Sequence, residues 1–340
     1  MKKHFKFSLL FALLVVFAMA LTACQPAATE APAAEEPAVE EPAVVEKTKV
    51  AVAFPGVVSD QSWNQFGYEG LLQAAEDCDL EIAYSEDVFQ DEQLETFRNY
   101  AAEGYDIIIG HGGEYADAIT TVAAEYPDLW FGDTNGLPEG DNVSEMIIGY
   151  NQMAYLAGAL ACEMTETNHI AFVGGESIPV VEAGAEQYTI AAQSCGKDVE
   201  VDVVYTANWA DVNKAYEAGL GLIADGADVL FHILDTADAG VIAAAEDEGV
   251  YAIGLYRDSS DLGENAVIGS ALGSPGGLIY ELACGHVEKG AKQYLNVHTP
   301  IWGVDMHFTD LTPADVQERV AAIHQQMVDG ELVIKNFGEE

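Results

Sequence analysis

The chain has 340 residues, half of them apolar, and its 57 acidic against 13 basic residues give a formal net charge of −44. The apolar content is typical of a globular protein rather than a disordered one. The charge argues against binding to nucleic acid, whose phosphates would be repelled, and against charge-driven attachment to anionic lipid headgroups.

The first 23 residues have the pattern of a secretory signal peptide. Three lysines precede an apolar run at residues 9–21, which is too short to be a convincing transmembrane span. The run ends in the sequence LTAC, residues 21–24, which resembles a bacterial lipobox. The resemblance implies cleavage before Cys24, lipid attachment to its thiol, and an extracytoplasmic protein anchored to the cell membrane. The alternative is an uncleaved anchor with an incidental cysteine.

Residues 24–46 are predicted to form a disordered tether. After Cys24 they are almost entirely Ala, Pro, Glu and Val, which offers too little large apolar surface to offset the chain entropy lost on folding. The remaining residues, 47–340, are enough for one folded region that has two lobes with their own cores.

Short apolar runs alternate with helical patterns through the rest of the chain. Helices are predicted at residues 64–77 and 116–125. The apolar runs predict strands at residues 50–54, 107–109, 129–131, 170–173, 201–205, 229–231 and 251–253. Strands that alternate with helices of ten or more residues indicate βαβ units and parallel sheets, so the predicted fold class is α/β.

An internal echo favours two similar lobes over one continuous sheet. In residues 104–118, Gly-Tyr-Asp leads into a strand and then into Ala-Asp-Ala, and in residues 226–239 Gly-Ala-Asp leads into a strand and then into Ala-Asp-Ala. Two such lobes form a cleft where the carboxyl ends of their strands meet, and ligands bind at such ends. Residues that directly follow strands are therefore the candidates for a site.

Four cysteines remain after Cys24, and they do not form a C-x-x-C pair. A zinc knuckle or a thioredoxin-like site is therefore not indicated. Outside the cell one or two disulfides are possible, and buried free thiols are an equally good interpretation. The four are Cys78, Cys162, Cys195 and Cys284.

Trp63 and Asp133 each follow a predicted strand. Trp63 lies at the start of a helix that Asp60 or Ser62 can cap, and its indole can stack on a flat ligand or simply pack. Asp133 can bond to ring nitrogens of such a ligand or cap a turn. The residues alone leave both alternatives open.

Two adjacent segments, DQSWNQ at residues 60–65 and YEGL at 68–71, resemble the D-x-S-F-N-Q…EG signature of the basic membrane protein family. These proteins are substrate-binding lipoproteins of ABC importers, typified by purine nucleoside receptors. The resemblance spans residues 49–332, with further matches at residues 116–118, 126–128, 142–144, 155–158, 174–180 and 226–232.

The resemblance implies a type I periplasmic-binding-protein fold in which two aromatic residues hold a purine ring. Trp63 matches the first aromatic position, and Trp209, in the segment YTANWAD, matches the second. Asn64 and Asn208 beside them are further ligand candidates. The implied lobes are residues 47–146 with 274–299, and residues 147–261 with 300–340, joined by a hinge.

Three polar positions depart from the family pattern, and at the first of them Phe54-Pro55 replaces a family acid at the end of the first strand. The acid that contacts ribose falls at Tyr256 in IGLYRD, residues 253–258, and its lysine partner falls at Gly273. A site without these groups lacks the bonds that discriminate for hydroxyls, so a free nucleobase or similar flat heterocycle is favoured over a nucleoside. Tyr256 and Asp258 remain candidates for other ligand contacts.

Other constellations are weaker. His111 and His232 lie at equivalent strand ends, but a single histidine in each lobe does not make a metal site. We expect no cofactor, no metal and no enzymatic activity, because no nucleophile–base pair stands out. The predicted protein is a monomer that binds a purine-like ligand and delivers it to ABC permease subunits. The alternatives are a receptor for a membrane signalling protein, or a different small solute such as a sugar.

Overall fold

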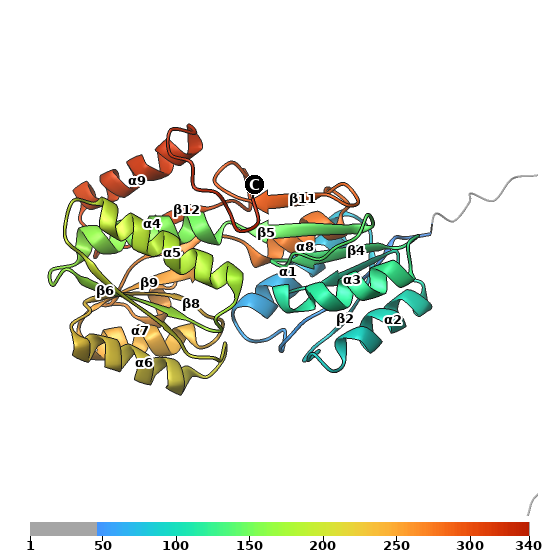
Figure 1. Ribbon diagram of the computed structural model, residues 1–340, viewed down its shortest axis with the longest axis horizontal. Helices are drawn as coiled ribbons and strands as arrows, with labels where there is room; N and C mark the ends of the chain where they lie inside the picture. The colour runs from blue at the N-terminus through green and yellow to red at the C-terminus, as the bar shows by residue number, and fades with distance from the viewer. Residues whose placement is uncertain (1–45, 340) are drawn as a thin grey trace, which may run out of the picture. The chain divides into compact units, whose positions relative to one another are not determined.

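The computed structural model describes residues 46–339, which belong to one compact unit built around two sheets (Figure 1). Each sheet has six strands, in the orders β11-β5-β4-β3-β1-β2 and β12-β10-β9-β8-β6-β7. The signal peptide, Cys24 and the tether predicted from the sequence lie outside the described residues.

The first lobe contains the first of these sheets with helices on both faces. Its elements are β1 (Lys49–Ala53), α1 (Trp63–Asp77), β2 (Glu81–Ser85), α2 (Gln93–Glu103), β3 (Ile107–Gly110), η1 (Gly113–Tyr115), α3 (Ala116–Glu125), β4 (Trp130–Thr134), β5 (Val143–Ile148), α8 (Pro275–Ala283) and β11 (Lys292–Leu295).

The second lobe repeats this arrangement. Its elements are α4 (Tyr150–Met164), β6 (His169–Gly174), α5 (Pro179–Ser194), β7 (Glu200–Tyr205), α6 (Val212–Asp225), β8 (Val229–Ile233), α7 (Asp238–Glu248), β9 (Tyr251–Tyr256), η2 (Ser260–Leu262), β10 (Val267–Leu272), β12 (Asp305–Phe308) and α9 (Ala314–Val328).

The central strands are mostly apolar because helices cover both faces of each sheet. All four residues of β3 and all five of β8 are buried. Strand pairing is parallel throughout the first sheet, with Val50 opposite Ile107. The predicted α/β fold with parallel sheets is confirmed, with one edge pair as an exception, because β12 pairs with β10 antiparallel.

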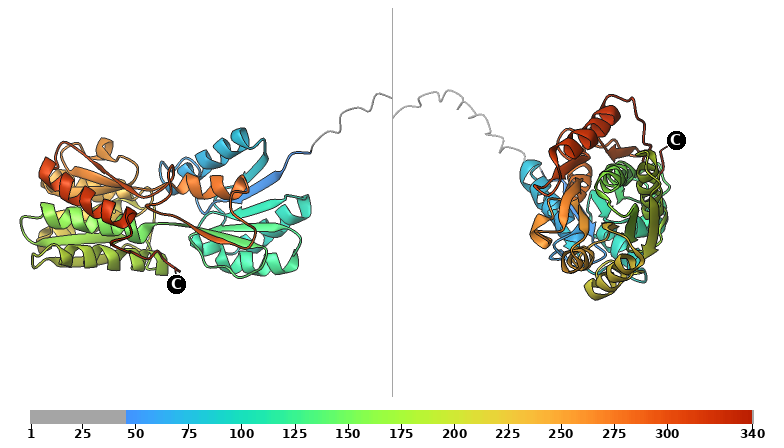
Figure 2. Two further views of the ribbon diagram at one scale, coloured as in Figure 1. Left: turned by 90° about the horizontal axis from the view of Figure 1, so that it is seen from above. Right: turned by 90° about the vertical axis from the view of Figure 1, so that its left-hand side faces the viewer.

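The chain passes between the two lobes three times, after β5, after β10 and after β11 (Figure 2). The first passage leads directly into α4, in which 13 of 15 residues are buried. Three short connections at one side of the molecule form the hinge of a two-lobed binding protein and leave the carboxyl ends of both sheets facing each other.

Two helix pairs approach closely and are joined by disulfides. A Cβ at Gly70 of α1 would lie 2.1 Å from the carbonyl oxygen of Gly276 in α8, and one at Gly158 of α4 would lie 2.3 Å from that of Tyr188 in α5. Disulfides Cys78–Cys284 and Cys162–Cys195 join the ends of the same pairs. The structure therefore selects disulfides over free thiols, the alternative left open by the sequence.

Within residues 46–339, the helices are all too short or too polar to span a bilayer.

Candidate ligand-binding cleft

A cavity of about 620 Å³ lies between the two lobes. Its walls are loops that follow β1, β2, β3, β4 and β5 on one side and β6, β7 and β8 on the other, so the carboxyl ends of both sheets converge on it. The volume falls within the range of small-molecule sites, roughly 300–1,000 Å³. This is the site that the two-lobed prediction requires.

Trp63 reaches the cavity because Asp60 fixes the start of α1. The two carboxylate oxygens of Asp60 accept from the backbone N–H groups of Ser62, Asn64 and Gln65 at 2.9–3.1 Å, and from Nδ2 of Asn64 at 2.7 Å. Asp60 therefore supplies the helix cap that the sequence assigned to either Asp60 or Ser62. The same turn places the side chains of Trp63 and Asn64 at the cavity wall.

His111 supports Trp63 from behind. The two rings stack with centroids 4.2 Å apart and planes 8° from parallel, and Nε1 of Trp63 donates to the carbonyl oxygen of His111. Nε2 of His111 must carry the proton, because it bonds to the carbonyl of Trp63, and Nδ1 then accepts from Thr134. Burial lowers the pKa of His111 to about 3, so the ring stays neutral.

Because His111 covers one face, Trp63 is only 6 % exposed and offers the cavity a small part of its indole. Trp209 on the opposite wall is half-buried and more available. Its backbone carbonyl accepts from the N–H groups of Asp235 and Ala237, which ties it to the loop after β8. Both tryptophans predicted from the sequence line one cavity, with unequal exposure.

Asn208, which precedes Trp209, also lines the cavity. Its Oδ1 accepts from the N–H groups of Ala210 and Asp211 at 2.8 and 2.7 Å, so this oxygen is used to shape the loop. Asn64 differs, because its Oδ1 is buried at the cavity wall without a hydrogen-bond partner among the described residues. Asn64 therefore keeps an acceptor for a ligand.

Three other residues predicted to contact the ligand, Asp133, Asp258 and Tyr256, do not line this cavity. Asp133 is fully buried, accepts from the N–H of Gly136 at 2.7 Å and does not line the cavity, so its observed role is the turn cap. Burial raises the pKa of its carboxyl well above the usual range. Asp258 is exposed and accepts from the N–H of Ser260, also away from the cavity.

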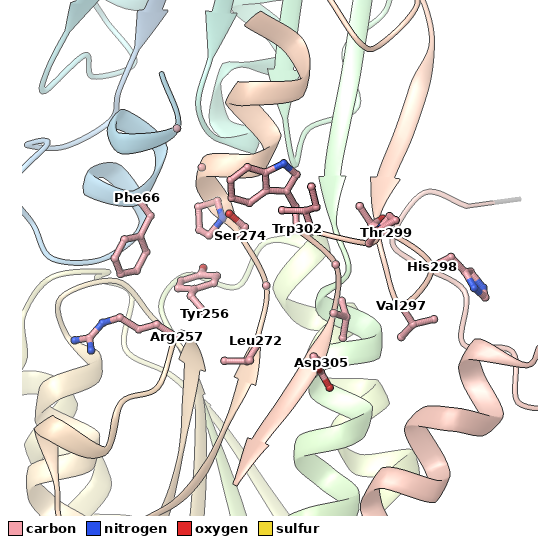
Figure 3. A pocket seen from close by; sticks show the side chains of 18 of the residues that line it. Phe66, Tyr256, Arg257, Leu272, Ser274, Val297, His298, Thr299, Trp302 and Asp305 are labelled. Carbon is pink, nitrogen blue, oxygen red and sulfur yellow. The ribbon is translucent and has the colours of Figure 1, made fainter. Parts of the chain in front are cut away.

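Tyr256 lines a second cavity of about 650 Å³ beside the hinge, together with Phe66, Ser274 and Trp302 (Figure 3). Its hydroxyl bonds to that of Tyr150, which lines the interlobe cavity. β9 and β10 contribute their last residues, Tyr256 and Leu272, but the crossing segments and the side of α1 make up most of this second cavity. We therefore place the candidate site in the interlobe cavity.

Several cavity residues were not identified from the sequence. Phe89, in the loop after β2, is 59 % exposed and lines the first-lobe wall. The sequence signal for Phe89 is its position just after a strand at the same edge of the sheet. That signal is lost, because β2 has a polar sequence and is not predicted as a strand. Tyr150, Glu114, Glu176 and Asp235 were also missed, because which loop residues face the opposite lobe depends on the closure of the two lobes.

Carboxylates dominate the electrostatics of the cavity. Protein surrounds Glu114 although its side chain is open to the cavity, and this desolvation, with Glu176 of the other lobe, raises its pKa to about 7. Desolvation also raises the pKa of Asp235 well above its usual range, and the charge of Asp60 across the cleft adds to this effect. Each carboxylate thus faces a like charge from the other lobe.

Metal-ligating side chains gather away from the cleft. His111 and His232 are both fully buried and neither lines the cavity. Within residues 46–339, two groups have metal-like spacing. One contains the sulfurs of the Cys78–Cys284 disulfide, and the other, around His169, lies at the amino ends of β6 and β7. Neither group lines the cleft.

Two α/β lobes, three hinge crossings and a cavity at the facing strand ends define a solute-binding protein with the type I periplasmic-binding-protein fold. Over residues 47–334 the chain matches the family described as ABC transporter substrate-binding protein PnrA-like, and it belongs to that family. Members of this family are extracytoplasmic solute-binding proteins and not enzymes, as the sequence predicted.

Relatives and solved structures span most of the chain. It is 29 % identical over 281 residues to transcriptional activator protein med of Bacillus subtilis, covering 81 % of this chain and 87 % of the relative. It is 27 % identical over 217 residues to a purine-binding protein of Brucella abortus, covering 63 % and 61 %. A solute-binding protein of an ABC transporter from Conexibacter woesei superimposes with TM-score 0.65 at 25 % identity, covering 86 % and 100 %.

Proposed function

We propose that the protein captures a flat heterocycle, a purine nucleobase or nucleoside, in the interlobe cleft and delivers it to the permease of an ABC importer. The observation that carries the proposal is the aromatic lining. Trp209 enters from the second lobe, and Trp63 and Phe89 enter from the first. Aromatic faces on both walls suit a planar ring, with about 0.5–1.5 kcal/mol per stacked pair beyond area burial.

Purine chemistry is supported by the Brucella relative named as a purine-binding protein. The nucleobase is favoured over the nucleoside, because the positions that the family resemblance assigns to ribose recognition carry Tyr256 and Gly273. Both line the hinge-side cavity and not the cleft. A ligand that contacts both lobes stabilises the closed form, which a permease can then distinguish from the open one.

Membrane attachment completes the proposal. Cleavage before Cys24 and lipidation of its thiol would hold the binding unit at the cell surface, and residues 25–46 would act as a flexible tether to the permease. Mass spectrometry of the membrane fraction tests this part. A diacylated N-terminal Cys24 is expected, and an intact N-terminus that begins at Met1 would contradict it.

A thermal-shift panel of bases, nucleosides and sugars tests the ligand class on residues 46–340, the unit that contains the whole core. We expect the largest shift with a purine base. Trp209→Ala should weaken that ligand at least about tenfold. Trp302→Phe alters only the hinge-side cavity and serves as the matched control. A sugar as the best ligand, or unchanged affinity in Trp209→Ala, would contradict the proposal.

A sensing role is the second candidate, because one relative is named a transcriptional activator. Uptake of the labelled best ligand by cells with and without the gene separates the two roles. Loss of uptake supports delivery to a permease. Normal uptake with loss of a ligand-dependent change in gene expression supports sensing.

A further inference from the structure

The interlobe cavity presents negative charge that the protein does not neutralise. Five carboxylates line it, whereas its lining contains no lysine, arginine or histidine. Asp87 and Glu114 come from the first lobe with Asp60, and Glu176 and Asp235 come from the second. Because the whole chain has an excess of acidic residues, the number of carboxylates in the cavity says little about a ligand. Whether each carboxylate already has a hydrogen-bond or ion-pair partner in the protein says more.

Three of these carboxylates have no protein partner among the described residues, and this indicates a ligand. Asp60 is engaged by the first turn of α1. The carboxylates of Glu114, Glu176 and Asp235 differ, because among residues 46–339 they form no hydrogen bond or ion pair with another residue. Asn64 Oδ1, buried at the same wall, is a further unpartnered acceptor. The cavity therefore offers acceptors and negative charge to a ligand.

These charges oppose closure of the empty cleft. Glu114 and Glu176 belong to opposite lobes and repel each other, as do Asp60 and Asp235. The lobes nevertheless touch here, since Oγ1 of Thr236 donates to the carbonyl oxygen of Asp60 at 3.0 Å. A positively charged ligand between the carboxylates converts this repulsion into attraction to both walls, and so couples binding to closure.

The aromatic lining fits the same ligand. A cation over the face of a tryptophan ring gains about 0.5–2 kcal/mol, more as water is excluded. Trp209 provides such a face next to the loop that contains Asp235. An anionic heterocycle, such as a nucleotide, would meet unpaired carboxylates on both sides and be rejected.

We infer that the cleft selects flat heterocycles that carry a positive charge over neutral ones of the same shape. The inference rests on the proposed function, because it specifies the ligand of that same stacking site. It names the substrate class more narrowly: a planar ring with a protonated or quaternary nitrogen that also presents N–H donors.

Two pairs of probes differ in charge but hardly in shape. The first is 1-methyladenosine, whose ring is cationic at pH 7, with its neutral isomer N6-methyladenosine. The second pair lacks a sugar and consists of N-methylquinolinium with neutral 2-methylquinoline. Calorimetric titration at pH 8, where Glu114 is ionised, is expected to show the cation of at least one pair binding about tenfold more tightly than its neutral partner.

The double variant Glu114→Gln/Asp235→Asn should reduce this preference to less than about threefold, because the cation loses its attraction to both walls of the cleft. The matched control Asp198→Asn/Glu200→Gln removes two charges at the amino end of β7 and should keep the preference.

Equal or tighter binding of the neutral partner in both pairs, with binding still lost in Trp209→Ala, would overturn the charge inference and leave the proposed function intact. Failure of all four probes and of every purine, with binding of a sugar instead, would overturn both.

Discussion

Gly175 determines where the indole of Trp209 can lie. A Cβ at position 175 would come within 2.1 Å of Cε3 of Trp209, a distance that requires the ring to move. The glycine is therefore part of the site although it does not itself line the cavity. A side chain at position 175, directly after β6, would therefore change the stacking surface that the loop after β7 provides.

Gly175→Ala should therefore weaken binding of the best heterocycle several-fold and destabilise the fold by about 1–3 kcal/mol through overpacking. Titration calorimetry and urea unfolding measure the two effects. Gly221→Ala on α6 meets open space and is the control, expected to stabilise by about 0.5–1 kcal/mol without changing affinity. Wild-type affinity in Gly175→Ala would show that the indole position does not matter for binding.

The sequence located part of the site because strand ends mark the edge at which a cleft forms. Trp63, Asn64, Asn208 and Trp209 all reach the cavity for this reason. The predicted strand at residues 129–131 ends too early, because Asp133 still belongs to β4 and is fully buried rather than exposed at the edge. Glu176 and Asp235 could not be foreseen as partners of first-lobe acids, because their relation depends on how the two lobes close.

At the scale of elements, apolar runs located β1, β3, β4, β6, β7, β8 and β9, but missed the inner strands β5 and β10 and the edge strands β2, β11 and β12. β3 and β8 are buried on both faces, and residues 107–109 and 229–231 within them are continuous apolar segments. Edge strands β2, β11 and β12 are partly exposed and mix polar with apolar residues, so their sequences do not stand out from loops. The antiparallel pairing of β12 was missed for the same reason.

The N-terminus of α1 positions the first-lobe wall of the interlobe cavity. Asp60→Ala removes the acceptor for three backbone N–H groups and should destabilise the protein by about 1–2 kcal/mol. Affinity should fall as well, since Trp63 and Asn64 sit in that turn. Asp60→Asn keeps a capping oxygen and should recover most of the stability in urea unfolding. Equal stability of Asp60→Ala and wild type would contradict this role.

The two disulfides should stabilise the helix pairs that they join. Replacing both Cys78 and Cys284 by alanine is expected to lower the free energy of unfolding by about 2–5 kcal/mol, because the bridge closes a long loop in the unfolded chain. Urea unfolding of the double variant measures this. Addition of reductant should destabilise the wild type, and an unchanged midpoint under both treatments would contradict the prediction.

For the whole molecule, carboxyls that the surrounding protein desolvates predict how the free energy of unfolding changes with pH. Desolvation raises the pKa of Glu114 and of Asp238 to about 7, so near pH 7 the folded state binds protons more strongly than the unfolded state. His111 and His232, whose pKa burial lowers to about 3, oppose this trend as pH falls toward 6.5, the value at which histidines of the unfolded chain are half protonated. The two carboxyls take up more protons between pH 8 and 6.5, because their pKa in the folded state is higher.

The free energy of unfolding of the unliganded protein should therefore rise as pH falls from 8 to 6.5. Urea unfolding at both values measures the change, and the variant Glu114→Gln/Asp238→Asn should make the profile flatter. A wild type that loses stability over this interval would mean that these acids are not shifted in the folded state.

The central claim is that a planar ring binds between the lobes against Trp209, and a crystal structure of the protein with its best ligand tests it most directly. The account predicts density for the ring stacked on Trp209, with an aromatic residue of the first lobe, Trp63 or Phe89, on the opposite wall. A ligand in the hinge-side cavity around Tyr256 and Trp302, or one in the cleft that does not contact Trp209, would contradict it.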